Sequence, residues 1–181
     1  MAKTRDDQKL VARFRAGDKA AFEQIVEQHD SDVAGLVCRL LGWSGEVDDV
    51  TQDVFLAVYR HLHRFRGDCS LKSWIFTITV NQCRSARYRR NFRFKQKAPV
   101  PEKVQPCGAT LAQRQEMYDA VHWAVARLPV RLREPVVLVY LEGLTVAEVC
   151  KILRISTNTC HVRLSRARDR LKESLEKMSV L

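Results

Sequence analysis

The chain has 181 residues, 46% of them hydrophobic, and a formal net charge of +10. This length suits one domain or two small ones. No run approaches the roughly 18 uninterrupted apolar residues of a membrane span, and the first residues lack the apolar segment of a signal peptide. The composition argues against a membrane protein or a secreted precursor, and we expect a cytosolic protein that does not insert into a membrane.

The excess positive charge is concentrated in one block of the sequence. Residues 61–100 contain 10 basic and 1 acidic residues, whereas residues 1–60 contain 8 basic and 11 acidic ones. A basic block of this kind indicates a surface that binds a polyanion such as nucleic acid. The acidic first third argues against a protein that simply coats nucleic acid, and it is suited to a basic protein partner.

The six cysteines and five histidines form no recognisable metal site. No two cysteines have Cys-x-x-Cys spacing, and the histidines complete no zinc pattern. We therefore expect no metal and no cofactor. Most cysteines fall where small apolar residues belong, so reduced thiols acting as small hydrophobic groups are the simplest interpretation. Redox sensing through Cys69 or Cys107, both in predicted loops, is the alternative.

Helical periodicity dominates the first half of the chain, and no alternating apolar pattern indicates a sheet. The spacing predicts short helices at Leu10–Arg15 and Ala20–His29, a third at Val33–Leu41, and a longer one at Val47–His63. The start of this last helix is polar, with acidic groups that complement the helix dipole. Docking of a basic partner is the functional alternative for this cluster, which comprises Asp48, Asp49, Gln52 and Asp53.

A long helix is predicted over Leu71–Arg90, after a loop at residues 63–70. Its C-terminal half is strongly basic, and aromatic residues alternate with the arginines. Aromatic groups among cations favour single-stranded nucleic acid, because bases stack on the rings and phosphates pair with the cations. Core packing is the simpler account of Trp74, which lies on the apolar side of the helix.

Residues 91–112 form a predicted flexible linker, since Pro99, Pro101, Pro106 and Gly108 prevent a continuous helix. The expected fold is therefore all-α, with two small helical domains at residues 1–90 and 113–181. The second domain is predicted to begin with a helix over Arg114–Leu128. A further helix follows Pro129 and runs to Leu141.

The stretch from Leu144 to Leu171 predicts a helix-turn-helix. Thr145 and Glu148 form a capping box at the start of the first helix, and Ser156 is a good N-cap for the second. In the second helix, Cys160, Leu164 and Ala167 recur with helical spacing. Small polar groups opposite this stripe and arginines beside it suit a major groove, where the tip meets base edges and the flanks meet phosphates.

The order and spacing of these motifs resemble the group 4, extracytoplasmic function (ECF) sigma factors of the sigma-70 family. In the first domain the resemblance is carried by Ala16-Gly17-Asp18, Asp48-Asp49-Val50-Thr51-Gln52-Asp53-Val54-Phe55, Phe65-Arg66-Gly67 and Ser73-Trp74-Ile75. In the second domain it is carried by Leu128-Pro129, Arg133-Glu134, Tyr140-Leu141-Glu142-Gly143-Leu144-Thr145, Ile155-Ser156 and Arg166-Ala167-Arg168.

The resemblance implies a function: such proteins bind core RNA polymerase, recognise promoter DNA at its −35 and −10 elements, and are commonly restrained by an anti-sigma factor. It implies core polymerase binding by Asp49, Gln52 and Asp53. It implies −10 DNA binding by Arg64, Arg66, Ser70, Trp74, Asn81, Arg84, Arg87 and Tyr88. It implies −35 DNA binding by Ser156, Asn158, Thr159, His161, Val162, Arg163, Ser165, Arg166 and Arg168.

Three residues depart from the family pattern, and two other classes of protein are considered. Arg154 stands where a glycine is usual, and His161 and Val162 replace commonly basic and polar residues, which leaves the −35 sequence open. A stand-alone helix-turn-helix regulator would bind a palindrome as a dimer without polymerase. No phosphate loop, nucleophile elbow or catalytic dyad indicates an enzyme.

Overall fold

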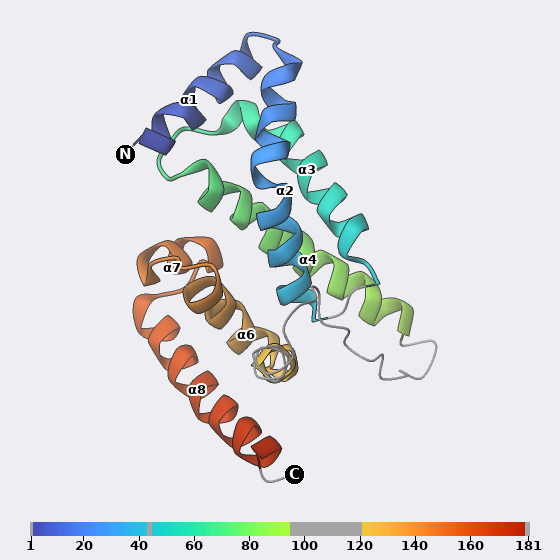
Figure 1. Cartoon of the computed structure of the whole chain (residues 1–181), viewed down its shortest axis with the longest axis vertical. Coiled ribbons are helices and arrows are strands. Elements are labelled where there is room, and N and C mark those ends of the chain that lie inside the picture. Colours follow the sequence, from blue (N-terminus) through green and yellow to red (C-terminus); the bar gives the residue numbers. More distant parts are fainter. Residues whose placement is uncertain (1, 43–44, 95–120, 180–181) are drawn as a thin grey trace.

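The computed structural model describes residues 2–42, 45–94 and 121–179. Over these residues the chain is all-α, without a strand, as predicted (Figure 1). The N-terminal part (residues 2–94) contains α1 (Ala2–Arg15), α2 (Lys19–Leu41), α3 (Val47–His61), the short 3-10 helix η1 (Leu62–Arg64) and α4 (Leu71–Phe94).

The C-terminal part (residues 121–179) begins with a helical segment over residues 121–127. It continues through α6 (Val130–Val136), the π-helical stretch η2 (Val137–Leu141), α7 (Val146–Leu153) and α8 (Thr157–Ser179). Of the predicted linker, residues 91–94 continue α4 and residues 95–112 lie outside the described residues. The division into two domains at residues 90 and 113 stays a prediction.

Helix α2 replaces two of the predicted helices, so the predicted break between Ala20–His29 and Val33–Leu41 is wrong. Residues 30–32 are polar but include no proline or glycine, and they fall on the outer face of a continuous helix whose inner face stays buried. The Asp18 carboxylate caps this helix by accepting from the amide of Ala20 at 3.0 Å. Gly42 ends it in the left-handed conformation, with φ of 76°.

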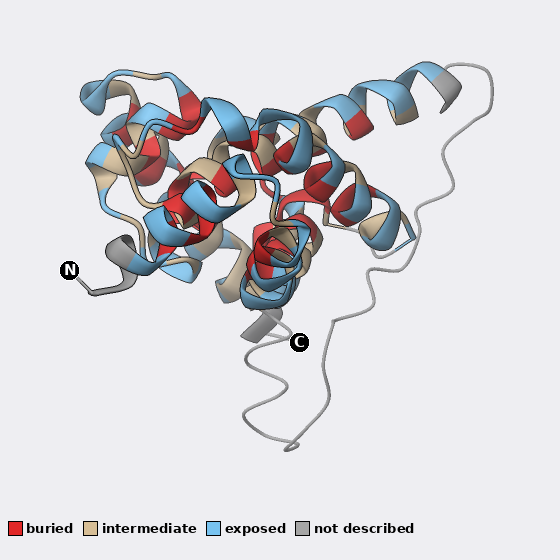
Figure 2. Ribbon diagram, turned by 90° about the horizontal axis from the view of Figure 1, so that it is seen from above, coloured by how far each residue is buried: buried red, intermediate tan, exposed pale blue. Residues whose placement is uncertain are grey.

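Helices α2, α3 and α4 pack against one another and bury the apolar faces predicted from their periodicity (Figure 2). Helix α1 packs across α2 and also contacts η1. The guanidinium of Arg15, at the end of α1, donates a hydrogen bond to the backbone carbonyl of Phe65. This bond joins the first helix to the loop between η1 and α4.

The helix-turn-helix is formed by α7 and α8, as predicted. Thr145 and Glu148 form both hydrogen bonds of the predicted capping box. The hydroxyl of Ser156 accepts from the amide of Thr159 at 3.2 Å, which confirms Ser156 as the N-cap of α8. Arg154 ends α7 with φ of 56°, a conformation that glycine adopts without strain.

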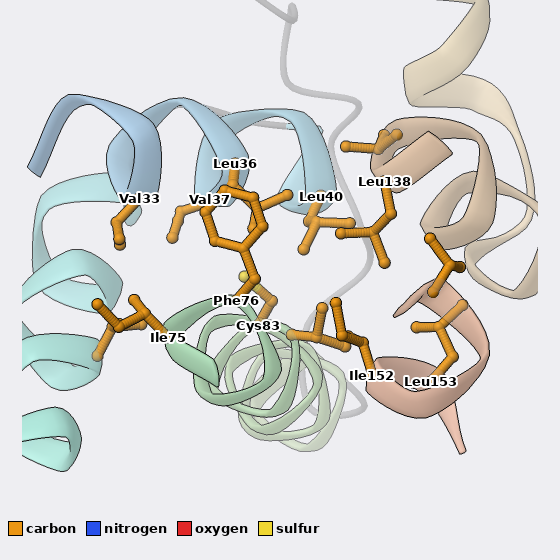
Figure 3. Close-up of a cluster of buried hydrophobic side chains, with 14 of the residues drawn as sticks. Val33, Leu36, Val37, Leu40, Ile75, Phe76, Cys83, Leu138, Ile152 and Leu153 are labelled. Atoms are coloured by element: carbon orange, nitrogen blue, oxygen red, sulfur yellow. The ribbon is translucent and has the colours of Figure 1, made fainter. Parts of the chain in front are cut away.

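The two parts of the chain contact each other. Helix α4 packs against α7, and α2 packs against α6 and η2. A single cluster of buried apolar side chains crosses this boundary, with Leu40 of α2, Phe76 of α4, Leu138 of η2 and Ile152 of α7 (Figure 3). We call this boundary the seam.

Candidate nucleic-acid interface

Helix α8 presents its predicted groove-facing side to solvent. Cys160, Leu164 and Ala167 are buried, as the predicted apolar stripe requires. The half-buried members of the predicted −35 set are Thr159 and Arg163. The exposed members are Ser156, Asn158, His161, Val162, Ser165, Arg166 and Arg168. The helix therefore offers a polar and basic face of the shape that a major groove admits.

A shallow hollow lies beside this face. Its volume is about 530 Å³, and its lining joins Val162, Ser165 and Arg168 of α8 to Val139 and Tyr140 of η2. Val162 is 40% exposed and Tyr140 54% exposed. The exposed valine of α8 therefore lies beside exposed side chains of η2, a neighbour that the helical periodicity of α8 did not reveal because η2 is distant from it in the sequence.

Helix α4 and the loop before it carry the predicted −10 residues, four of which are exposed. Arg64 lies at the end of η1 and Arg66 in the loop that follows, and Asn81 and Tyr88 project from the helix. Tyr88 is 75% exposed, and Phe92, one turn further along the same helix, is 71% exposed. Exposed rings beside cations are the elements of a surface on which unpaired bases stack.

Two other predicted −10 residues have structural partners near the start of α4. The hydroxyl of Ser70 accepts from the amide of Ser73 at 3.1 Å and so caps the helix. Trp74 is half-buried and meets the ring of Phe65 edge-on, with ring centroids 5.5 Å apart. This is the core packing that the sequence favoured for Trp74, and both assignments to DNA stay predictions.

Arg84 and Arg87, the two remaining residues of the predicted −10 set, both lie close to Glu134 of the C-terminal part. Arg84 donates to both carboxylate oxygens of Glu134, at 2.9 and 2.7 Å. Arg87 lies 3.8 Å from the same carboxylate and also donates to the backbone carbonyl of Leu40. The hydrogen bonds that Arg84 donates to Glu134 raise the pKa of Arg84, whereas burial lowers the pKa of Arg87.

Arg133 is a central residue of the seam that the sequence did not identify as such. Its guanidinium donates to the backbone carbonyls of Leu40 and Leu41, at 3.0 and 2.9 Å, and to those of two residues just before α6, Ala126 and Leu128. Burial lowers the pKa of Arg133 to about 10. A Cβ at Gly42 would lie 2.7 Å from its Nη1, so glycine leaves the space it needs.

The predicted polymerase-binding residues form an acidic face on α3, made of Asp49, Gln52 and Asp53. Asp49 and Gln52 are exposed, and Asp53 is half-buried. The carboxylate of Asp53 pairs with Arg89 of α4 at 3.1 Å. Periodicity placed these three side chains on one surface, but it could not show the partner on another helix.

The cysteines that the structure describes are free thiols. Burial raises the pKa of Cys83 to about 12 and that of Cys160 to about 11, so neither is ionised at neutral pH. Burial also raises the pKa of Cys69, which argues against a reactive thiolate there. Cys107 lies outside the described residues. Within the described ranges, no group of His, Cys, Asp or Glu could hold a metal ion.

The described part of the chain contains no helix long and apolar enough to cross a membrane. Its architecture is instead that of a helical DNA-binding protein with a helix-turn-helix and a second, basic aromatic surface. Residues 25–93 match the sigma-70 region 2 family, and residues 118–171 match sigma-70 region 4. The chain belongs to the sigma-70 family of RNA polymerase sigma factors.

Relatives of full length support this membership. The chain is 36% identical over 171 residues to the ECF RNA polymerase sigma factor SigM of Mycobacterium tuberculosis, covering 94% of this chain and 85% of the relative. It is 32% identical over 187 residues to the ECF RNA polymerase sigma-E factor of Escherichia coli, covering 97% of each.

Solved structures share the fold. CnrH, solved in complex with the cytosolic domain of CnrY, superposes with a TM-score of 0.69 at 28% identity over 95% of this chain and 98% of that one. The sigma factor RpoE of Bartonella quintana, solved in complex with the anti-sigma factor NepR, superposes with a TM-score of 0.73 over 86% of this chain and 96% of that one. Its identity of 23% makes it evidence for the fold alone.

Proposed function

We propose that this protein is a group 4, ECF sigma factor, which binds core RNA polymerase and directs it to start transcription at particular promoters. The observation that carries the proposal is the occurrence of regions 2 and 4, in that order, in one chain of 181 residues. The names of the relatives, which are ECF sigma factors, support the assignment to this group.

We assign three separate tasks to the surfaces described above. The acidic face on α3 binds core polymerase, because Asp49 and Gln52 are exposed beside the half-buried carboxylate of Asp53 and can pair with a basic partner. The loop before α4 and the basic aromatic side of α4 bind the −10 element as a single strand, since unpaired bases can stack on Tyr88. The exposed face of α8 reads the −35 element in the major groove.

The proposed partners are therefore core polymerase, promoter DNA and an anti-sigma factor. The last rests on CnrH, which is similar over 95% of this chain and was solved with the cytosolic domain of a second protein. The protein is not proposed to catalyse a reaction, and its role requires no cofactor. A stand-alone helix-turn-helix regulator is the alternative, and the acidic face on α3 counts against it because such a regulator needs no polymerase.

Reconstitution tests the proposal. Purified protein is mixed with core polymerase, and transcription is measured from genomic fragments selected by binding of the mixture. We expect transcripts with a defined start that core polymerase alone does not make. Asp49→Arg combined with Asp53→Arg should abolish binding to core polymerase, because both changes put a cation where the partner requires an anion.

The double variant needs a control for folding, because Asp53 also pairs with Arg89. Asp6→Arg with Asp30→Arg makes the same change of charge at two exposed positions of α1 and α2. This control should bind polymerase as the wild type does. If the variant with Asp49→Arg and Asp53→Arg binds polymerase as tightly as the wild type does, the docking assignment is wrong. If the wild-type protein binds DNA as a dimer without polymerase, the stand-alone regulator is favoured.

A further inference from the structure

Two cysteines meet between the helices of the helix-turn-helix. Cys150 lies in the last turn of α7, and Cys160 lies in the first turn of α8. The thiol of Cys160 is hydrogen-bonded to that of Cys150. Because the two residues are ten positions apart and have none of the spacings that mark a cysteine motif, the pair could not be recognised from the sequence.

The backbone fixes both cysteines in place. The carbonyl of Cys150 accepts from the amide of Arg154 and, at 3.1 Å, from that of Ile155. The amide of Cys160 donates to the carbonyl of Ser156 at 3.0 Å. Three residues connect the two helices, which pack against each other. A short connection that is fixed at both ends keeps the two thiols at a high effective concentration for reaction with each other.

The arrangement suits a disulfide between α7 and α8. A disulfide has an S–S length of about 2.05 Å and joins Cα atoms about 4.4–6.8 Å apart. Two thiols that already share a hydrogen bond, on helices in direct contact, can reach this geometry by rotation of their side chains and a small shift of the backbone. The bond would close a short loop and so restrict the unfolded chain, which stabilises the folded protein.

The two thiols differ in their access to solvent. Cys150 is half-buried, whereas Cys160 is fully buried among the apolar side chains of the core. Burial, together with the neighbouring Cys150, raises the pKa of Cys160 to about 11. An oxidant from solvent therefore reaches Cys150 first, and Cys160 is the thiol that responds second.

We propose that Cys150 and Cys160 form a peroxide-reactive pair that closes into an intramolecular disulfide between α7 and α8, and that this bond protects the helix-turn-helix from irreversible oxidation. The proposal adds a modification site to the protein and does not depend on polymerase or promoter DNA. The oxidant is hydrogen peroxide, and one molecule of it is consumed for each disulfide.

The reaction has two steps. The sulfur of Cys150, after losing its proton to water, attacks one oxygen of the peroxide. The O–O bond breaks, the hydroxide that leaves takes up a proton, and Cys150 becomes a sulfenic acid. The sulfur of Cys160 then attacks the sulfur of Cys150, the S–O bond breaks, and the second hydroxide leaves as water with the proton of Cys160. The two thiols lose two electrons, and the peroxide is reduced to two waters.

The protective effect follows from what happens without a second thiol. A sulfenic acid that meets no thiol is oxidised further to a sulfinic acid, and this step is irreversible in the absence of a repair enzyme. On Cys150 the sulfinate would place a negative charge against the apolar cluster on which this side chain packs. An unpaired buried charge is costly, so this oxidation would loosen α7 from α8.

The first measurement locates the bond. The full-length protein is treated with hydrogen peroxide, its remaining thiols are blocked with N-ethylmaleimide, and the monomer is digested with trypsin. Cys150 lies in the tryptic peptide 134–151 and Cys160 in the peptide 155–163. We expect these peptides to be joined, with the loss of two hydrogen atoms, and to be separated by dithiothreitol.

Cys69→Ser is the control for this measurement, because Cys69 is a half-buried thiol on the loop before α4 and should leave the joined peptides unchanged. Blocked thiols at both positions after peroxide treatment would overturn the proposal, and so would a sulfinic acid at Cys150 of the wild type. Joined peptides found in the dimer but not in the monomer would also overturn it.

The second measurement is the urea midpoint before and after peroxide, followed by circular dichroism. Oxidation should raise the midpoint of the wild type by about 1 M, and dithiothreitol should reverse the change. In Cys160→Ala, peroxide should instead lower the midpoint, and dithiothreitol should not restore it. Cys150→Ala should respond to peroxide no more than the double variant Cys150→Ala with Cys160→Ala, which measures oxidation elsewhere in the chain.

Protection is refuted if Cys160→Ala tolerates peroxide as well as the double variant does. Should Cys160→Ala fail to fold before treatment, Cys160→Val replaces it, because valine keeps an apolar group of similar size at this buried position. The same irreversible loss is expected of that variant, and its absence would equally refute protection. Both measurements use the free protein, so their outcome is separate from that of the function proposed above.

Discussion

The two DNA-binding surfaces proposed for this protein differ in what covers them. The recognition face of α8 is open to solvent from Ser156 to Arg168. The face of α4 is divided: Asn81 and Tyr88 are exposed, whereas Arg84 donates to Glu134 and Arg87 donates to the backbone carbonyl of Leu40. On the proposed −35 face the side chains are accessible from solvent, whereas on the proposed −10 face two of the arginines already have partners within the protein.

The largest expected effect is a loss of stability on substitution of Arg133 at the seam. Arg133→Ala removes a buried guanidinium together with its hydrogen bonds to the carbonyls of Leu40 and Leu41. Charged hydrogen bonds contribute about 1.5–3 kcal/mol each, so we expect a loss of about 3 kcal/mol in the free energy of unfolding. Urea denaturation followed by circular dichroism measures it.

Arg168→Ala on the open face is the matched variant, because this arginine is exposed and should change stability by no more than about 0.5 kcal/mol. A loss of stability as large for Arg168 as for Arg133 would remove the distinction between a covered and an open surface.

The next effect concerns the exposed portion of α4. Tyr88→Ala should weaken capture of unpaired bases by about 2 kcal/mol, because the stacking of a base on an aromatic ring contributes about 1–3 kcal/mol. The defect should appear in transcription from duplex promoters and become smaller on templates whose −10 region is already unpaired. Equal defects on both templates would argue that Tyr88 does not act in strand opening.

A smaller effect is expected for Val162→Ser on α8. Valine can read a base only by apolar contact, for which the methyl group of thymine is the natural target, so its loss should change preference at one −35 position by about 1 kcal/mol. Selection from a −35 library measures this preference. Arg168→Ala should instead weaken binding to all sequences and lower the salt slope by about 1. A lower salt slope for Val162→Ser, together with a changed sequence preference for Arg168→Ala, would mean that α8 is oriented differently in the groove.

The smallest effect tests the turn between the two helices of the open face. Arg154 adopts a positive φ, at a cost of about 1–2 kcal/mol that glycine avoids, while glycine loses about 0.5–1 kcal/mol through its larger freedom in the unfolded chain. Arg154→Gly should therefore stabilise the protein by about 0.5 kcal/mol, measured as a higher urea midpoint. A lower midpoint would mean that the arginine side chain contributes to the turn.

Local patterns predicted local structure well. The capping box at Thr145, the N-cap at Ser156 and the stripe through Cys160 are all present, because each depends on residues within a few positions of one another. The predicted break within α2 was wrong because the two apolar runs on either side of it were interpreted as separate helices. Polar residues at 30–32 looked like a connection, although they only occupy the solvent side of one helix.

Contacts between distant residues could not be predicted in this way. Arg84 and Glu134 are 50 positions apart, and each belongs to a helix whose own periodicity is satisfied without the other. From the sequence alone, Arg84 was therefore predicted to be a surface cation that can bind DNA. The same reasoning applies to the partner of Asp53, because Arg89 lies on another helix 36 positions away.

The hydrogen bond from Arg15 to the carbonyl of Phe65 bears on where a minimal fragment of this protein should begin. The match to sigma-70 region 2 starts at residue 25, so a fragment cut at that boundary would retain every matched residue and lose α1. It would also lose the contact of α1 with η1, which ends at Arg64, and the anchor of the loop that carries Arg66. Fragments intended for promoter binding should therefore keep the first helix, although it lies outside the matched region.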